Sequence, residues 1–206
     1  MDRKVVIATG NLGKFNEIKK LLFHEFDVFF SLKDFQEKVE IVEDSPFYIE
    51  NAIKKARKVG DRFGFNAIAD DSGLEVDALG GRPGIYSSRY GKDDDERISR
   101  LLSELQDVPW EKRTARFVAY VIFYMPEKGS FYVFYGQLKG YIGFERRGKE
   151  GFGFDPVFYL PEYGKNLAEI KLDEKNKISH RGRAVNALKV FLNSDFFRKT
   201  GILMKL

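Results

Sequence analysis

The sequence contains no cysteine and only two histidines, His24 and His180, among its 206 residues. The absence of cysteine excludes disulfides, thiolate-bound zinc, iron–sulfur clusters and a cysteine nucleophile. Because histidine is so scarce, a histidine-rich metal site is not expected either. Any bound metal is therefore expected to be a hard cation held by oxygen atoms, such as magnesium.

Long apolar runs are also missing. No run approaches the roughly 20 residues that a membrane-spanning helix needs. Residues 1–4 are followed by only a short apolar stretch, so no secretory signal is predicted. We therefore expect a cytoplasmic protein that makes no contact with a membrane. A net charge of +4 and a pI near 9.0 favour an anionic partner, but only weakly.

Aromatic residues, in contrast, are abundant: 20 Phe and 10 Tyr predict an aromatic core. Alternating or continuous apolar runs predict strands at 5–8, 26–32, 116–124, 131–142 and 155–160, and a strand, a turn and a second strand over 67–79. Apolar spacings of three and four predict helices after Gly13, after Ser45-Pro46 with Ser45 as N-cap, after Asp95, and around 185–192. This order predicts an α/β protein with a mixed sheet. No composition break marks a linker, so we expect one domain, 1–206, whose two lobes share one sheet.

Two adjacent carboxylates form the most informative part of the chain. The apolar run 67–69 leads directly into Asp70, Asp71, Ser72 and Gly73. We expect Ser72-Gly73 to be a turn that ends a buried strand. Buried carboxylates need a metal, a partner or a proton-transfer role. Because side chains alternate along a strand, Asp70 and Asp71 should point in opposite directions, and only one should face a given site.

A glycine-rich turn between the first expected strand and helix is a candidate phosphate site. Its glycines permit close approach of a ligand, and the helix start offers free N–H groups. Its spacing is not that of a P-loop. An ordinary strand-to-helix turn remains an open alternative. The residues are Thr9, Gly10, Asn11, Leu12, Gly13 and Lys14.

Further acidic residues lie elsewhere in the first half of the chain. Glu43 precedes the second expected helix and could hold magnesium together with Asp71, although a surface acid is the alternative. Residues Asp93–Asp95 precede the third expected helix. There we favour stabilisation of the positive helix end over metal binding.

The second half carries residues suited to a planar ligand. In Gly151-Phe152-Gly153-Phe154-Asp155-Pro156 an aromatic face could pack on a base while Asp155 bonds its edge. A turn in the aromatic core is the alternative. Lys175, His180 and Arg181 lie near the start of the last helix, against the preference of the helix dipole, which favours anion or base recognition.

These segments together resemble the inosine/xanthosine triphosphate pyrophosphatase family. The resemblance runs in order from residue 5 to about 190 and depends on six motifs, each weak alone. They are Thr9-Gly10-Asn11-x-x-Lys14-x-x-Glu17, Glu43 before Phe47-x-x-Glu50-Asn51-Ala52, Ala69-Asp70-Asp71-Ser72-Gly73-Leu74, Pro83-Gly84-Ile85-Tyr86-Ser87, Gly151-Phe152-Gly153-Phe154-Asp155-Pro156, and Glu174-Lys175 with Ser179-His180-Arg181-Gly182.

The resemblance implies an elongated mixed sheet flanked by helices, with a cleft between two lobes. It implies a magnesium-dependent homodimer that hydrolyses ITP, dITP or XTP to the monophosphate and pyrophosphate. Asp71 would be the catalytic carboxylate and, with Glu43, a metal ligand. Substrate would be bound by Thr9, Gly10, Asn11, Leu12, Gly13, Lys14, Ser72, Phe152, Gly153, Phe154, Asp155, Lys175, His180 and Arg181. Phe154 departs from the family, which often has Tyr there, so a hydroxyl is lost.

This chemistry is coherent in physical terms. Magnesium would neutralise phosphate charge and orient a water that a carboxylate deprotonates. Lysines and a helix start would stabilise the leaving pyrophosphate. Donors such as His180 and Arg181 could select the C6 carbonyl of a 6-keto purine, because pairing them with an amino group would be costly.

Two other functions fit parts of the sequence. A related pyrophosphatase could act on dTTP, UTP or modified pyrimidines. The basic pI and the aromatic residues also fit a nucleic-acid-binding module. Against that module, the aromatic residues follow strand patterns that indicate a core, and the Lys and Arg residues are scattered. We therefore expect a nucleotide substrate and no nucleic-acid partner.

Overall fold

The computed structural model describes residues 3–37 and 39–199. Across these residues we found no helix with the length and apolar character that crossing a membrane requires. The chain divides into two compact units. Unit 1 comprises Met1–Asp71, Ala119–Gly136 and Arg181–Leu206, and unit 2 comprises Ser72–Val118 and Gln137–His180.

The fold is a mixed α/β arrangement, as predicted from the alternation of strands and helices. The strand order is β2-β1-β3-β5-β6-β7-β8, and β4 also pairs with β3. β1 is parallel to β2 and β3, whereas β3/β4, β6/β7 and β7/β8 are antiparallel. The strands are β1 (Lys4–Ile7), β2 (Val28–Ser31), β3 (Asn66–Val76), β4 (Pro83–Gly84), β5 (Thr114–Met125), β6 (Ser130–Ile142), β7 (Phe158–Leu160) and β8 (Lys165–Asn166).

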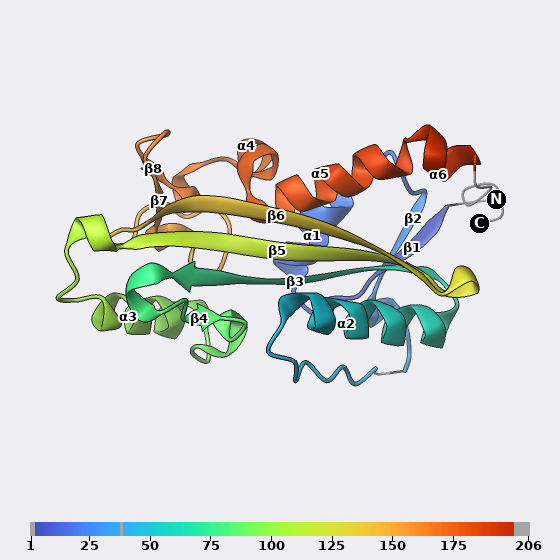
Figure 1. The fold of residues 1–206 in the computed structure, drawn as a ribbon, viewed down its shortest axis with the longest axis horizontal. Helices are drawn as coiled ribbons and strands as arrows, with labels where there is room; N and C mark the ends of the chain where they lie inside the picture. The colour runs from blue at the N-terminus through green and yellow to red at the C-terminus, as the bar shows by residue number, and fades with distance from the viewer. Residues whose placement is uncertain (1–2, 38, 200–206) are drawn as a thin grey trace. The chain divides into compact units, whose positions relative to one another are not determined.

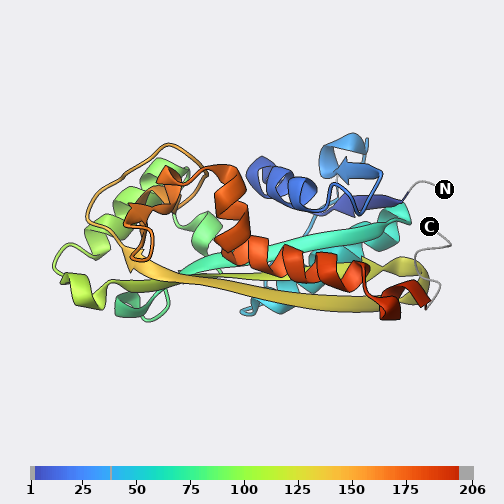
Figure 2. The same cartoon turned by 90° about the horizontal axis from the view of Figure 1, so that it is seen from above.

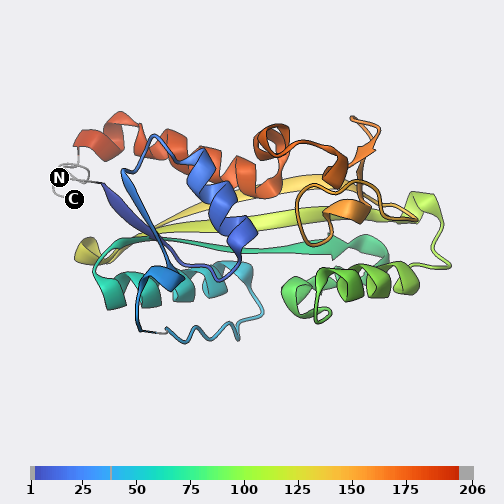
Figure 3. The ribbon, with the colours of Figure 1, turned by 180° about the vertical axis from the view of Figure 1, so that it is seen from behind.

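Helices cover the strands (Figures 1 and 3). The α-helices are α1 (Leu12–Leu21), α2 (Tyr48–Phe63), α3 (Asp94–Glu104), α4 (Leu172–Ile178), α5 (His180–Leu192) and α6 (Asp195–Lys199). The helices expected after Gly13, Ser45-Pro46 and Asp95 and near the C-terminus are confirmed, whereas α4 and α6 were not predicted. A cleft between two lobes and a sheet shared by them stay predictions.

Unit 1 has a core on each face of its strands, because successive side chains point to opposite faces. Val5, Ile7 and Ile68 pack with α1, α5 and α6. Val6 and Ala67 belong to the other core, against α2. Figure 2 shows α5 running alongside β6, where the ring of Phe191 lies 4.5 Å from that of Tyr132.

The start of α2 differs from the prediction. Ser45 is not the N-cap: the helix begins at Tyr48, and Phe47 is its N-cap residue. The Ser45 hydroxyl instead accepts the N–H of Phe47 at 3.1 Å and donates to Glu50 at 2.5 Å. Ser45 therefore fixes the chain entering the helix, which is the segment that follows Glu43.

β3 also differs from the prediction. Ser72-Gly73 is not a turn, because one strand runs without interruption from Asn66 to Val76. Beyond Ser72 the strand keeps partners in unit 2: Leu74 is paired with Gly84 of β4 and donates its N–H to the hydroxyl of Ser87 at 2.8 Å. Asp70 and Asp71 therefore lie in the middle of a strand.

Unit 2 has its own core, in which Leu74 and Val76 pack with α3 and with the segment 154–170. The start of α3 is capped by Asp93, whose Oδ1 accepts the N–H of Glu96 at 2.8 Å. The prediction that Asp93 stabilises the start of this helix is thus confirmed.

Candidate active site

Asp70 and Asp71 point to opposite faces of β3, as the alternation of the strand predicts. Asp70 lies on the face covered by α1 and α5, where its Oδ2 is 2.6 Å from Nζ of Lys14 and 3.4 Å from a guanidinium nitrogen of Arg181. Asp71 lies on the α2 face, where its Oδ1 is 3.0 Å from Nζ of Lys55. The two neighbouring acids therefore have separate partners from separate helices.

The surroundings of Asp70 form a closed ionic cluster inside unit 1. Arg181, from the first turn of α5, also lies 2.5 Å from Oε2 of Glu17, which belongs to α1. The side chains of Asp70, Arg181 and Glu17 are at most 3% exposed. Charges this deeply buried are tolerated only when each has a close opposite charge. The cluster therefore joins β3, α1 and α5 through their side chains.

The surroundings of Asp71 are more open. The Lys55 ammonium bridges Asp71 and Glu43, at 3.0 and 2.8 Å. The amide of Asn51 lies 3.5 Å from Oδ2 of Asp71, and it also exchanges two 3.0 Å hydrogen bonds with the backbone of Ser45. A cation thus already lies between the two carboxylates that the sequence assigns to a metal, and Glu43 is 38% exposed at its side chain.

The two aspartates also differ in their pKa values. Burial would raise the pKa of Asp70, but the charges of Arg181 and Lys14 outweigh burial and hold it well below its usual range. For Asp71 burial prevails and raises the pKa, and Lys55 offsets only part of that effect. Asp70 is thus a permanent anion, while Asp71 holds a proton more readily, as a proton acceptor should.

Burial and neighbouring charges also shift the pKa values of the two lysines and of Glu43. Burial lowers the pKa of the Lys14 ammonium, although Asp70 opposes the shift. Burial would lower the pKa of Lys55, but the adjacent charges of Asp71 and Glu43 raise it, so Lys55 stays charged. Burial opposes ionisation of Glu43, yet Lys55 brings its pKa below the ordinary value.

The segment from Thr9 to Lys14 forms the expected link between a strand and a helix. Asn11 is the N-cap of α1: its Oδ1 accepts the N–H of Lys14 at 3.0 Å, and its own N–H bonds the Thr9 hydroxyl at 3.1 Å. A Cβ built at Gly10 would meet no atom within 4 Å, so open space lies over this turn. An anion can therefore approach the helix start, whose first N–H groups lack partners within the helix.

The candidate base-recognition residues of unit 2 form a second cluster. Asp155 Oδ2 accepts a hydrogen bond from Nζ of Lys175 at 2.6 Å and from the N–H of Phe152 at 3.0 Å. The same ammonium lies 4.9 Å from the centre of the half-buried Phe152 ring. Gly151 has φ of +77°, and a Cβ there would lie 2.0 Å from Oδ2 of Asp155. The arrangement presents one ring and one charged pair from a tight turn.

Other residues assigned to the substrate occupy different surroundings. Phe154 is buried in the core of unit 2, with its ring edge-on to Tyr90 at 6.3 Å, so its ring packs inside the protein. His180 stacks on Phe117 at 4.7 Å and is buried. Arg181 contacts Glu17 and Asp70 inside unit 1. Ser72 follows Asp71 in β3 and is half-buried.

Sequence reasoning missed two residues that contact Asp71. Lys55 and Asn51 lie one turn apart on α2, on the face turned to β3. Asn51 was part of a matched motif without an assigned role. The available signal was a Lys and an Asn at spacing four within an otherwise apolar helix stripe, because polar groups on a buried face need a polar partner.

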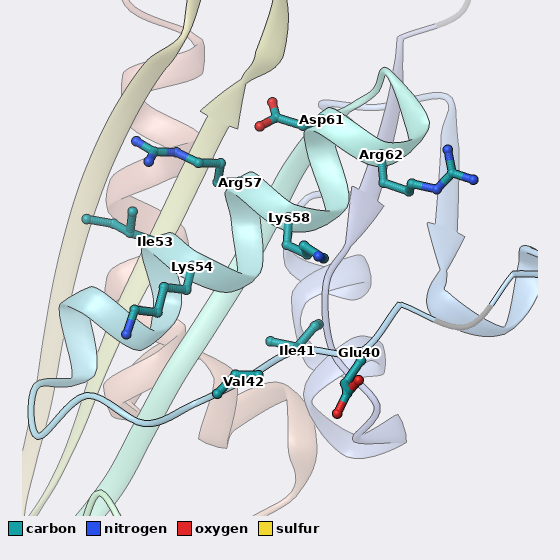
Figure 4. Close-up of a pocket in the computed structure, with 9 residues that line it drawn as sticks. All are labelled: Glu40, Ile41, Val42, Ile53, Lys54, Arg57, Lys58, Asp61 and Arg62. Atoms are coloured by element: carbon teal, nitrogen blue, oxygen red, sulfur yellow. The ribbon is translucent and has the colours of Figure 1, made fainter.

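A cavity of about 590 Å³ lies elsewhere in unit 1, between α2 and the segment 40–42 (Figure 4). None of the candidate site residues lines it. Two of its four cations are already paired, Lys54 with Asp44 at 2.6 Å and Arg62 with Glu37. It is lined by Glu40, Ile41, Val42, Ile53, Lys54, Arg57, Lys58, Asp61 and Arg62. The candidate chemistry is therefore separate from this cavity.

Comparison with known proteins gives consistent matches over nearly the whole chain. The Ham1 family model matches residues 5–191. The dITP/XTP pyrophosphatase of Dictyoglomus thermophilum is 41% identical over 198 residues, covering 94% of this chain and 97% of that protein. That of Bacillus cereus is 46% identical over 191 residues, covering 90% and 93%. A HAM1 protein structure from Coxiella burnetii superposes with a TM-score of 0.82 at 38% identity, covering 92% and 98%.

Proposed function

The chain belongs to the Ham1 family, and from this premise we propose that it is a pyrophosphatase that hydrolyses dITP, XTP and ITP. As a hydrolase acting on acid anhydrides, it converts each non-standard purine nucleoside triphosphate to the monophosphate and pyrophosphate. The observation that carries this function is the identity of 41–46% to dITP/XTP pyrophosphatases over 90% or more of the chain. Removal of such nucleotides from the nucleotide pool follows from that activity.

Pyrophosphatases of this family depend on a metal, and we propose magnesium, bound by Glu43 and Asp71. The fit is supported by the Lys55 ammonium between their oxygens, which marks a place suited to positive charge. No group of three or more acidic or histidine ligands occurs within residues 3–37 and 39–199. That agrees with magnesium, which is usually held by one or two carboxylates together with waters and substrate phosphates. When bound, the ion neutralises phosphate charge and lowers the pKa of water.

The chain's own residues in unit 1 would then handle the phosphates. Asp71 orients and deprotonates the attacking water. The start of α1 and Lys14 hold the triphosphate, supported by the open space over Gly10. Lys55 stabilises negative charge that develops in the transition state. Asp70 stays a fixed anion that holds Lys14 and Arg181 in place.

In unit 2 we assign recognition of the base to Phe152, Asp155 and Lys175. The Phe152 ring can stack on a purine, and the Asp155–Lys175 pair supplies an acceptor and a donor for its edge. Ser72 and Gly153 would contact substrate through polar backbone or hydroxyl groups. Phe154 and Arg181 support the site from inside their units, and His180 supports Phe117 by stacking on its ring. A homodimer, a cytoplasmic location and the absence of a nucleic-acid partner stay predictions.

A panel of nucleotides tests this function. Purified protein with magnesium should release pyrophosphate from dITP, XTP and ITP far faster than from dATP, dGTP, dTTP and UTP, and chelation should stop the reaction. Asp71→Asn should lower kcat by about 10²-fold or more. The matched control is Asp107→Asn, an exposed aspartate of unit 2 that should behave as wild type.

Two outcomes would contradict the proposal. A preference for dTTP or UTP would favour the pyrimidine-directed alternative. Tight, steeply salt-dependent binding to nucleic acid without nucleotide hydrolysis would favour a nucleic-acid-binding module. Full activity of Asp71→Asn would remove Asp71 from the mechanism while leaving the reaction itself in place.

A further inference from the structure

The turn that carries Phe152 has two anchors. The first is internal: Asp155 holds the Phe152 N–H at 3.0 Å and Lys175 at 2.6 Å. The second comes from α3, where Oδ2 of Asp94 accepts the N–H of Gly153 at 2.7 Å. Gly153 directly follows Phe152 and has φ of +64°, a conformation that side chains disfavour. The Asp94 bond therefore fixes the peptide unit that joins Phe152 to Gly153.

Asp94 is well placed to be a rigid anchor. It is the first residue of α3, and its other oxygen, Oδ1, is 2.7 Å from a guanidinium nitrogen of Arg97 one turn later. Arg97 thus holds one carboxylate oxygen, and the other accepts the Gly153 N–H. A hydrogen bond to an ionised carboxylate is stronger than one between neutral groups. Losing this bond would leave Asp155 as the remaining anchor of the turn and loosen the peptide unit that follows Phe152.

The three consecutive aspartates at this helix start have three different contacts. Asp93 caps the helix through the N–H of Glu96. Asp95, whose side chain is 85% exposed, pairs with Arg146. Within the described residues of unit 2, Asp94 is the one of these three aspartates that accepts a hydrogen bond from the turn 151–155. Favourable interaction with the helix dipole is available to all three, so it does not account for the specific bond of Asp94.

We propose that Asp94 is a positioning residue for base recognition, which sets the orientation of the Phe152 ring through the backbone of Gly153. This inference rests on the proposed function, in which Phe152 stacks on the purine. Asp94 acts on the substrate only through this backbone and does not touch it. Its loss should weaken binding and selectivity for 6-keto purines while leaving the phosphate-handling residues of unit 1 unchanged.

The test compares Asp94→Ala, Asp94→Asn and Asp95→Asn in steady-state kinetics with dITP and dGTP. Asp94→Ala should raise KM for dITP about tenfold or more, with a smaller change in kcat, because a charge-assisted hydrogen bond is lost. Asp94→Asn keeps an oxygen acceptor and should recover part of the loss. Asp95→Asn removes the same charge from the same turn and should keep the wild-type KM. Equal KM values for Asp94→Ala and Asp95→Asn would overturn the proposal.

A second measurement separates this inference from the proposed function. Hydrogen exchange of the backbone amides at 151–155 should be faster in Asp94→Ala than in Asp95→Asn, with the melting temperature confirming that both variants fold. If the wild type hydrolyses no purine nucleotide, the proposed function fails, and faster exchange still identifies Asp94 as the anchor of the turn. Unchanged exchange in Asp94→Ala overturns the anchoring role whatever the enzyme's substrate.

Discussion

Replacing Asp70 with asparagine should destabilise the protein more than any comparable change at Asp71. The substitution removes the charge that lies 2.6 Å from Lys14 and 3.4 Å from Arg181 in a place where the Asp70 side chain is 0% exposed. Removing one partner of a buried ion pair typically costs about 3–5 kcal/mol of unfolding free energy. Arg181 keeps Glu17 at 2.5 Å, and the Lys14 side chain is 18% exposed, so we expect the lower end of that range.

The size of the effect can be read from thermal unfolding. For a chain of this length, about 1 kcal/mol shifts Tm by roughly 2–4 °C, so a loss of about 3 kcal/mol should lower Tm by roughly 6–12 °C. Calorimetry or a dye-based melt at neutral pH measures this directly. The result requires reversible or at least matched scans, because irreversible unfolding makes Tm depend on scan rate.

The adjacent Asp71→Asn substitution is the matched control. Lys55 keeps Glu43 at 2.8 Å when Asp71 loses its charge. Burial raises the pKa of Asp71, so ionised Asp71 is itself unfavourable in the folded state at neutral pH. Asp71→Asn should therefore leave Tm unchanged or slightly higher while abolishing most activity. A fall in Tm at Asp71→Asn equal to that at Asp70→Asn would refute the division of the pair into a structural and a catalytic acid.

The pH dependence provides a further check on Asp70. Its folded-state pKa lies below the unfolded value of about 3.9, so its ionisation contributes stability that is fully present above that pH. The contribution is lost as pH falls through the folded-state pKa. The difference in stability between wild type and Asp70→Asn should thus be constant near neutrality and narrow below about pH 4. A difference that grows on acidification would show that Asp70 is not the ionised partner.

Three further predictions concern the active site. Asn51→Ala should raise the metal concentration needed for half-maximal activity, measured by magnesium titration, because Asn51 joins the backbone of Ser45 to Asp71; an unchanged titration curve would contradict this. Gly151→Ala should impair dITP binding, seen as a higher KM, because its Cβ would lie 2.0 Å from Asp155 Oδ2 at a φ of +77°; wild-type KM would refute it. In the metal-free protein the pKa of Asp71, measured by NMR titration, should lie above the ordinary aspartate value of about 3.9, since burial raises it; a value at or below that would show that Lys55 outweighs burial.

Local patterns predicted much of the fold because the elements bury apolar stripes of clear period. Val5 and Ile7 lie in one core and Val6 in the other, so both faces of this strand are buried. A strand buried on both faces has a continuous apolar sequence, which is the pattern seen here. The prediction of a turn at Ser72-Gly73 was wrong, because the conformational propensity of a residue is a weak local preference that pairing with other strands can override. Pairing of Leu74 with Gly84 and the bond to Ser87 keep the strand extended, and both partners are distant in sequence.

The partners of the site residues were harder to predict than the residues themselves. Glu17 and Arg181 are 164 positions apart, and no local rule connects them. The opposite directions of Asp70 and Asp71 followed from strand period alone. The roles of Lys55 and Asn51 did not, because their contacts depend on how α2 packs on β3. The short helices α4 and α6 were missed because brief segments give little periodicity.

Because β3 is uninterrupted, the function of the site depends on the register of this strand. Asp70 and Asp71 are chemically identical. Only their alternation along the strand places one in the ionic cluster and the other on the open face. With the strand up to Ile68 held in place, deleting Ala69 would move Asp71 into the place of Asp70 and Ser72 into the place of Asp71. The ionic cluster would keep an aspartate beside Lys14, whereas the face turned to Lys55 would carry a serine. For this pair, therefore, position along the strand, and not residue type, decides which aspartate is structural and which is catalytic.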